Sequence, residues 1–279
     1  MRVDGHHHVW DPATADYPWM TDELAVIRRR FEPADLAPEL AANGIDRTVL
    51  VQTRASLDET VRFLALTEET PFIAGVVGWV DLTDPGLAST LRRLAAGRGG
   101  RRLVGIRHQV HDEPDPDWLR RQDVRRGLAT IADRGLVYDL LLRPRELPAA
   151  IDTVDALPDL RFVVDHIAKP EIRTRGWEPW ASRLAELASH ANAWCKVSGL
   201  VTEADWHAWT PDDIRPYVDH VVRMFGPERL LFGSDWPVCL LAASYAQVVE
   251  LARELVTTDA GASGSFFGAT AVEVYRLDV

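Results

Sequence analysis

Three consecutive histidines, His6, His7 and His8, lie close to the start of the 279-residue sequence. They belong to an apolar, strand-like run from Val3 to Trp10, whereas a purification tag usually lies outside the folded segment. Because successive side chains of a strand point to opposite faces, His6 and His8 share one face and His7 points away. We interpret His6 and His8 as site residues and His7 as a bystander that faces the helices. The alternative is a tag remnant, or surface histidines without a role.

Two more polar side chains close apolar runs further along the chain. His166 follows the run 162–164, and Asp235 follows the run 230–232. Taken alone, His166 is typical of a hydrogen-bonded strand end, and Asp235 could cap the next helix. In a closed barrel, however, the first and last strands are neighbours, so both side chains would meet the first-strand histidines at one mouth.

Three histidines and one carboxylate can open an ester-like carbonyl in two ways. The four residues are His6, His8, His166 and Asp235. Together they could bind one divalent ion, zinc first among the choices, which polarises a carbonyl and lowers the pKa of water. Without a metal, Asp235 would act as general base on water while the histidines donate to the carbonyl oxygen. The sequence contains no Gly-x-Ser-x-Gly nucleophile elbow, which disfavours a serine hydrolase.

Further residues at the predicted strand ends are suited to holding a substrate. Arg107 and His108 close the fourth apolar run, where a guanidinium and an imidazole can bind hydroxyl groups or a carboxylate. Trp10, Trp19 and Trp236 lie at or just after strand ends, where an indole can stack on a sugar ring. For each tryptophan the alternative is packing in the core or in a loop.

Eight short runs of apolar and β-branched residues predict the strands that position these side chains. The runs are Arg2–Val9, Arg47–Gln52, Phe72–Val80, Leu103–Gln109, Leu136–Leu142, Arg161–His166, Ala193–Ser198 and Leu230–Asp235. Their starts lie roughly 25 to 45 residues apart, which suits a repeat of strand, loop, helix and loop. Runs such as 48–51 are apolar throughout, which predicts burial on both faces and therefore a parallel sheet.

Eight such units closing on themselves predict an α/β fold, a single-domain (β/α)8 barrel of TIM type over residues 1–279. Apolar spacing predicts helices between the strands, for example over 123–134. Longer irregular stretches at 11–25, 111–118 and 171–179 follow predicted strands and are expected to wall the mouth. A doubly wound open sheet is the alternative, but no Gly-rich dinucleotide fingerprint follows any predicted strand.

Composition restricts the partners and the compartment. The chain has 31 Lys and Arg against 42 Asp and Glu, a net charge of −11, which disfavours nucleic acid as a partner. Cys195 and Cys239 are its two cysteines, too few for a disulfide framework, so a reducing compartment is expected. No apolar run approaches the length of a membrane span, and we expect a cytoplasmic protein that does not enter a membrane. A homodimer is a reasonable expectation for a soluble enzyme.

Five motifs together resemble the lactonase branch of the amidohydrolase superfamily, the amidohydrolase-related proteins that include sugar-acid and muconolactone-type lactonases. The motifs are Asp4–Trp10, Gly105–His108, Asp165–Pro170, Lys196–Leu200 and Phe232–Pro237. Each is weak alone, but all five occur in order and at barrel spacing over essentially the whole chain. The roles of the two lysines in these motifs, Lys169 and Lys196, stay open.

The resemblance implies a distorted (β/α)8 barrel that hydrolyses a lactone. His6 and His8 match the first-strand His-x-His pair, His166 matches the later histidine, and Asp235 matches the last-strand aspartate that deprotonates water. Members of such families differ in metal use, since some hold zinc or another divalent ion and others work without one. Arg107 stands where a metal-bridging lysine would close the fourth strand, which disfavours a two-metal site.

Three functions follow as hypotheses. The first is hydrolysis of a small lactone, of the sugar-acid type, to the open hydroxy acid. The second is a metal-dependent decarboxylase of an aromatic or enolic acid, because related barrels share the first-strand histidines and the last-strand aspartate. The third is a barrel that binds a sugar acid without turnover, which the complete set of ionisable residues disfavours.

Overall fold

Eight parallel strands form one sheet in which each strand pairs with the next along the chain. The computed structural model describes residues 1–256 and 263–279. The strands are β1 (Val3–His7), β2 (Arg47–Val51), β3 (Ile73–Gly78), β4 (Leu103–His108), β5 (Val137–Leu140), β6 (Arg161–Val164), β7 (Ala193–Val197) and β8 (Leu230–Phe232). Each lies within one of the eight predicted runs, and the predicted (β/α)8 barrel is confirmed.

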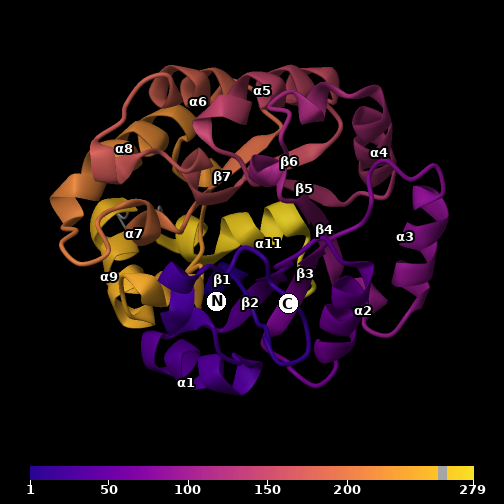
Figure 1. Cartoon of the computed structure of the whole chain (residues 1–279), viewed down its shortest axis with the longest axis horizontal. Coiled ribbons are helices and arrows are strands. Elements are labelled where there is room, and N and C mark those ends of the chain that lie inside the picture. The colour runs from indigo at the N-terminus through magenta and orange to yellow at the C-terminus, as the bar shows by residue number, and fades with distance from the viewer. Residues whose placement is uncertain (257–262) are drawn as a thin grey trace.

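Helices follow the strands, and most of them surround the sheet as an outer ring, whereas α11 crosses the centre of the view (Figure 1). They are α1 (Pro33–Asn43), α2 (Leu57–Leu66), α3 (Leu87–Ala96), α4 (Gln122–Asp133), α5 (Leu147–Ala156), α6 (Trp180–Ala188), α7 (Leu200–Glu203), α8 (Pro211–Phe225), α9 (Tyr245–Val256) and α11 (Thr270–Tyr275). Local signals set their ends. Ser56 caps α2 by accepting from the N–H of Glu59, and Gly44 ends α1 with a φ of 66°. None of the described helices is long and apolar enough to span a membrane.

Backbone hydrogen bonds beyond the regular ladder close the barrel between β8 and β1. The N–H of Asp235 donates to the carbonyl oxygen of His6 over 2.8 Å. The N–H of His8 donates to the carbonyl oxygen of Trp236 over 2.7 Å. This seam places the carboxylate that ends β8 directly beside the histidines of β1.

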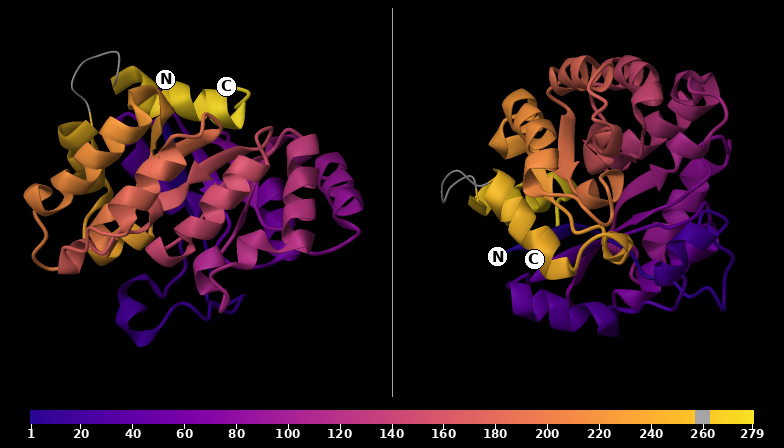
Figure 2. Two further views of the ribbon diagram at one scale, coloured as in Figure 1. Left: turned by 90° about the horizontal axis from the view of Figure 1, so that it is seen from above. Right: turned by 60° about the vertical axis from the view of Figure 1, so that its left-hand side comes forward.

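The C-terminal helix α11 covers the opposite end of the barrel. Arg161 is the first residue of β6 and donates to the carbonyl oxygen of Val274 over 2.5 Å, so α11 lies at the N-terminal ends of the strands. Figure 2 shows this helix in yellow at one end of the molecule, beside both termini. Its side chains join strand residues in one apolar cluster of Val3, Val49, Val51, Ala74, Val77, Val137, Val163, Leu231, Ala271, Val274, Tyr275 and Leu277. The barrel interior therefore has an apolar floor.

A β-bulge in β1 determines which of its histidine side chains point into the barrel. Along the pairing with β2, β1 advances three residues from Asp4 to His7 while β2 advances two. Val3 belongs to the apolar floor inside the barrel, so strict alternation would turn His6 outward. The extra residue reverses the alternation and turns His6 inward. Gly5 lies at this point, where a Cβ would come within 2.9 Å of the backbone of β8.

Candidate active site

Side chains at the C-terminal mouth of the barrel converge on the carboxylate of Asp235. Its Oδ1 atom lies 3.4 Å from Nε2 of His8, 3.7 Å from Nε2 of His6 and 4.0 Å from Nε2 of His166. The Nε2 atoms of His6 and His8 are 3.2 Å apart. The side chain of His6 is fully buried, and the other three are 4 to 6% exposed. The structure thus brings the four predicted site residues together at the C-terminal ends of the strands.

A hydrogen bond at Nδ1 orients each of two imidazoles, those of His8 and His166. Nδ1 of His8 lies 2.8 Å from the carbonyl oxygen of Val51, which can only accept, so His8 carries its proton on Nδ1. Nδ1 of His166 lies 2.9 Å from the hydroxyl of Ser198. Both rings therefore present Nε2 toward Asp235.

The backbone around this group adopts conformations that side chains rarely accept. Four consecutive residues after β6, from His166 to Lys169, have φ between 47° and 59°, and Asp235 has a φ of 56°. Such values cost free energy and persist only where the surrounding structure enforces them. Gly199, at φ 62°, makes room for the turn, because a Cβ there would lie 2.7 Å from Nδ1 of His166 and 3.1 Å from Asp235.

His7 lies on the other face of β1. Its ring is fully buried, and among the described residues neither ring nitrogen has a hydrogen-bond partner. Burial lowers the pKa of His7 to about 3. The ring takes no part in the group around Asp235.

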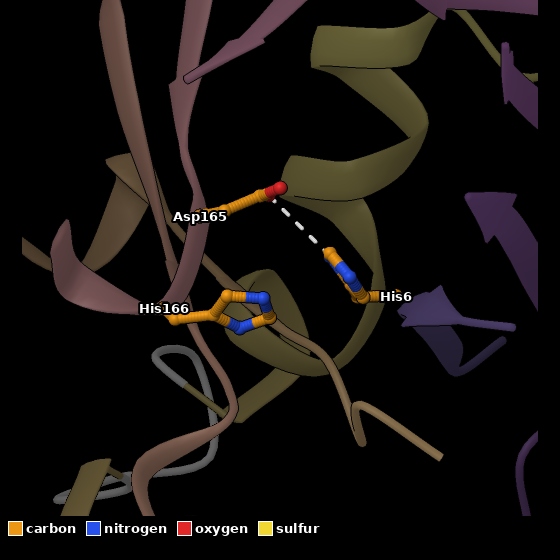
Figure 3. A group of neighbouring side chains, drawn as sticks. All are labelled: His6, Asp165 and His166. Carbon is orange, nitrogen blue, oxygen red and sulfur yellow. Dashed lines mark ion pairs between the residues drawn. The ribbon is translucent and has the colours of Figure 1, made fainter. Parts of the chain in front are cut away.

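A layer of buried charges lies directly beneath the histidines. Arg107 of β4 donates to Asp165 over 2.9 Å, and Nζ of Lys196 lies 2.9 Å from the other oxygen of Asp165. Lys196 also donates to Asp139 of β5 over 2.5 Å. Asp165 in turn lies 3.4 Å from Nδ1 of His6, the ion pair drawn in Figure 3. These two carboxylates and two cations balance each other inside the barrel.

Burial controls the protonation of the site. It lowers the pKa of His6 well below its usual value and lowers that of His166 to about 4. Burial alone would raise the pKa of Asp235, but the imidazoles of His166, His8 and His6 outweigh it, so the pKa is lowered. At neutral pH the site therefore combines the neutral imidazoles of His6 and His166 with an ionised Asp235 carboxylate.

Comparison with known proteins places this arrangement in a family. The sequence matches the amidohydrolase family over residues 3–277. The chain belongs to the amidohydrolases. This amidohydrolase is similar to two proteins named L-fucono-1,5-lactonase. The protein of Burkholderia ambifaria is 38% identical over 100% of this chain and 96% of its own. The protein of Burkholderia multivorans is 39% identical over 99% of this chain and 96% of its own.

Solved structures agree with the family. A crystal structure of an amidohydrolase from Burkholderia multivorans with bound zinc matches with a TM-score of 0.94 and 38% identity, covering 99% of each chain. A decarboxylase from Novosphingobium aromaticivorans matches with a TM-score of 0.69 and 15% identity, over 99% of this chain and 97% of its own. At that identity the likeness extends to the fold alone.

The amidohydrolase site has a donor set that fits one zinc ion. Ligands at 2.0–2.1 Å around a tetrahedral zinc lie about 3.3 Å apart. The Nε2 atoms of His6 and His8 are 3.2 Å apart, and that of His8 is 3.4 Å from Asp235. Imidazole nitrogens with a carboxylate oxygen are also the ligands zinc favours. Asp165 could join His6 and His166 in a second set, but its oxygens are engaged by Lys196 and Arg107.

The two predicted substrate-binding residues of β4 lie in different surroundings. Arg107 is buried below the mouth, donates to the carbonyl oxygen of Gln52 and places Nη1 3.3 Å from Nε2 of His6. His108 is half-buried, accepts from the indole N–H of Trp79 at 3.0 Å and lies 2.7 Å from the Glu113 carboxylate. Both ring nitrogens of His108 are therefore occupied.

Two of the predicted tryptophans are buried against Phe31, and the third lies beside the segment that follows β2. Trp10 and Trp236 are 2 and 3% exposed and pack on Phe31 with ring centres 5.6 and 5.3 Å away. Trp19 is half-buried and donates to the carbonyl oxygen of Thr53 over 3.0 Å. Of the three, Trp19 has the most exposed indole.

Several residues of the site were absent from the sequence-based prediction. Asp139 and Tyr275 belong to the buried layer, and Ser198 orients His166. An aspartate within the apolar run 136–142 was the one signal for Asp139. Lys169, whose role stayed open, forms an ion pair with Glu203 at 2.6 Å near the mouth.

Proposed function

We propose that this amidohydrolase hydrolyses the lactone of a sugar acid to the open hydroxy acid. The observation that carries the proposal is the convergence of Asp235 with the Nε2 atoms of His6, His8 and His166. The names of the two similar Burkholderia proteins support a sugar-acid lactone as the substrate class. Small polar substrates of this kind suit an opening at the strand ends of a barrel.

Asp235 is the general base in this proposal. Its carboxylate, held ionised by the neighbouring imidazoles, takes a proton from a water molecule as the oxygen adds to the lactone carbonyl carbon. The tetrahedral intermediate then collapses, and the ring C–O bond breaks. The proton held by Asp235 passes to the departing alkoxide oxygen, so the product is a hydroxy acid and the base is regenerated.

The histidines stabilise the negative charge that develops on the carbonyl oxygen. His6 and His166 are neutral because burial lowers their pKa values, so each can donate one hydrogen bond without competing for the proton of water. The cation of Arg107, 3.3 Å from His6, adds positive potential on the same side. One divalent ion held by His6, His8, His166 and Asp235, zinc by the fit of the donor set, would take the place of these hydrogen bonds, polarise the carbonyl and lower the pKa of water.

The rim of the mouth selects the substrate. Arg107 and His108 orient hydroxyl groups or a carboxylate, and His108 does so by exchanging Trp79 or Glu113 for the substrate, since these two residues occupy its ring nitrogens. Trp19 stacks on the sugar ring, while Trp10 and Trp236 form the buried wall behind it.

A parallel assay tests the proposed reaction. Acid release from a panel of aldonolactones, L-fucono-1,5-lactone among them, is followed by pH-stat, beside a carbon dioxide assay on hydroxybenzoates. We expect acid release with a sugar-acid lactone and no carbon dioxide. Carbon dioxide release without lactone opening would replace the proposal with a decarboxylase, and ligand-induced stabilisation without turnover would replace it with a binding protein.

A further inference from the structure

The carboxylate of Asp4 ties the first and the last strand of the barrel together. One of its oxygens, Oδ1, accepts from the backbone N–H of Ser234 over 2.9 Å and from that of His6 over 3.1 Å. The other oxygen, Oδ2, accepts from the hydroxyl of Tyr245 over 3.0 Å. Asp4 is fully buried, so water does not compete for these three hydrogen bonds.

These bonds lie where the backbone pairing of the barrel is sparse. Regular ladders join each strand to the next from β1 to β8. In the described part of the chain, β1 and the end of β8 share one isolated bridge, between His7 and Trp236. The β-bulge between Asp4 and His7 also interrupts the pairing of β1 with β2. Because a bulge disrupts the ladder around it, a side-chain acceptor is needed to hold the strands at this point.

Both backbone N–H groups that Asp4 holds belong to the candidate active site. His6 carries one imidazole of the site, and Ser234 directly precedes Asp235, whose N–H donates to the carbonyl oxygen of His6 over 2.8 Å. The hydroxyl of Ser234 accepts from the N–H of Trp236 over 3.0 Å, which braces the turn on the other side of Asp235. One carboxylate oxygen therefore holds the backbone on both sides of the 3.7 Å gap between Nε2 of His6 and Oδ1 of Asp235.

We propose that Asp4 is a positioning residue that sets the separation between His6 and Asp235. It acts through the backbone N–H groups of the two strands, and Tyr245 anchors its carboxylate to helix α9. Without the carboxylate, two buried N–H groups lose their acceptor, and the strand ends shift to find other partners. The gap between Nε2 and Oδ1 then widens. Groups that act together on one carbonyl or one ion lose efficiency when their separation changes.

The variants Asp4→Ala and Asp4→Asn test this role. Alanine removes all three hydrogen bonds, whereas asparagine keeps an oxygen for the two backbone N–H groups and turns its amide N–H toward the hydroxyl oxygen of Tyr245. The direct readout is the crystal structure of each full-length variant beside that of the wild type. We expect the gap between His6 and Asp235 to widen by about 0.5 Å or more in Asp4→Ala and to be restored in Asp4→Asn.

An unchanged gap in Asp4→Ala would overturn the proposal. Asp4→Ser takes its place if the alanine variant does not fold, because serine keeps one acceptor in a shorter side chain. The expectation for Asp4→Ser is the same widened gap, and the same unchanged gap would contradict it. A gap that stays equally wide in Asp4→Asn would also overturn the proposal, because the acceptor for the two N–H groups is present there.

Asn192→Ala is the matched control for a general loss of hydrogen bonds. The Asn192 amide donates to three backbone carbonyl oxygens within residues 154–160, over 3.1 to 3.3 Å. Asn192 directly precedes β7 and so lies at the N-terminal ends of the strands, opposite the site. We expect urea unfolding to show a loss of stability in this variant as in Asp4→Ala, with the gap unchanged. A gap widened equally in both variants would show general loosening and overturn the specific role of Asp4.

A kinetic readout connects the gap to the reaction and rests on the proposed lactonase function. We expect Asp4→Ala to lower kcat by about 10- to 100-fold with little change in KM, and Asp4→Asn to recover most of the loss. Asn192→Ala should keep the wild-type kcat. If the wild type opens no lactone, the lactonase proposal fails while the crystal structures still decide the role of Asp4. If the wild type is active and Asp4→Ala keeps both its kcat and its gap, the positioning role alone is wrong.

Discussion

Oδ1 of Asp235 lies 3.4 Å from Nε2 of His8, across the seam where the last strand of the barrel meets the first. The carbonyl oxygen of Val51 holds a proton on Nδ1 of His8, so Nε2 of the ring faces the carboxylate. At this separation one proton or one cation can lie between the two groups, which is the property that the proposed chemistry uses.

Replacement of the base is expected to remove most of the activity. Asp235→Asn keeps the shape of the side chain but cannot take a proton from water, so kcat on the best lactone should fall by about 10² to 10⁴. The control is Asp117→Asn, because Asp117 is exposed on the surface and pairs with Arg120. Undiminished turnover by Asp235→Asn, measured by pH-stat at equal protein concentration, would rule out its role as base.

Adjacent histidines should differ sharply in function. His8→Leu removes a nitrogen that faces Asp235, so we expect kcat to fall by about 10²-fold or more and bound zinc to fall below one per chain. His7→Leu replaces a buried ring whose nitrogens have no hydrogen-bond partner among residues 1–256 and 263–279, and it should keep both activity and zinc. Turnover and elemental analysis on the same preparations give the comparison. Equal losses in the two variants would contradict the assignment of the two faces.

The size of Gly199 is expected to matter for the position of His166. Gly199→Ala places a methyl group 2.7 Å from Nδ1 of His166 and should lower kcat by about 10- to 100-fold through displacement of the ring. Gly44→Ala is the matched control, since Gly44 has a φ of 66° in the same left-handed region and its added Cβ would meet only Nη1 of Arg2, at 3.5 Å. Both variants carry a backbone cost of about 1 kcal/mol. A loss of kcat in Gly44→Ala equal to that in Gly199→Ala would attribute the effect to backbone strain.

His7 should make the protein sensitive to acid. An unfolded chain protonates this residue near pH 6.5, whereas the folded protein keeps it neutral down to about pH 3. Between these values the unfolded state binds the extra proton, so stability is present above pH 6.5 and falls as the pH drops, by about 1.4 kcal/mol per unit. From pH 6.5 to 5, His7→Leu should therefore lose about 2 kcal/mol less than wild type. Urea unfolding at the two pH values measures the difference, and parallel losses would show that His7 does not titrate in this way.

Local sequence determined the strands and the residues at their ends. Apolar runs bounded by polar residues define strands without knowledge of their partners, and a repeat of eight such runs leaves the barrel as the way to bury them. The side chains that end the runs, among them His166 and Asp235, must then share one mouth. The pairing of Asp235 with the β1 histidines followed from this topology before any distance was known.

Tertiary structure alone decided what surrounds those side chains. Tyr275 reaches Asp139 because α11 folds back across the floor, and nothing in the spacing of either residue indicates that contact. The bulge near Gly5 and the positive φ values from His166 onward depend on neighbours that are distant in sequence. Periodicity reports which face a residue takes, whereas the partners across a closed barrel depend on register and packing between segments far apart in the chain.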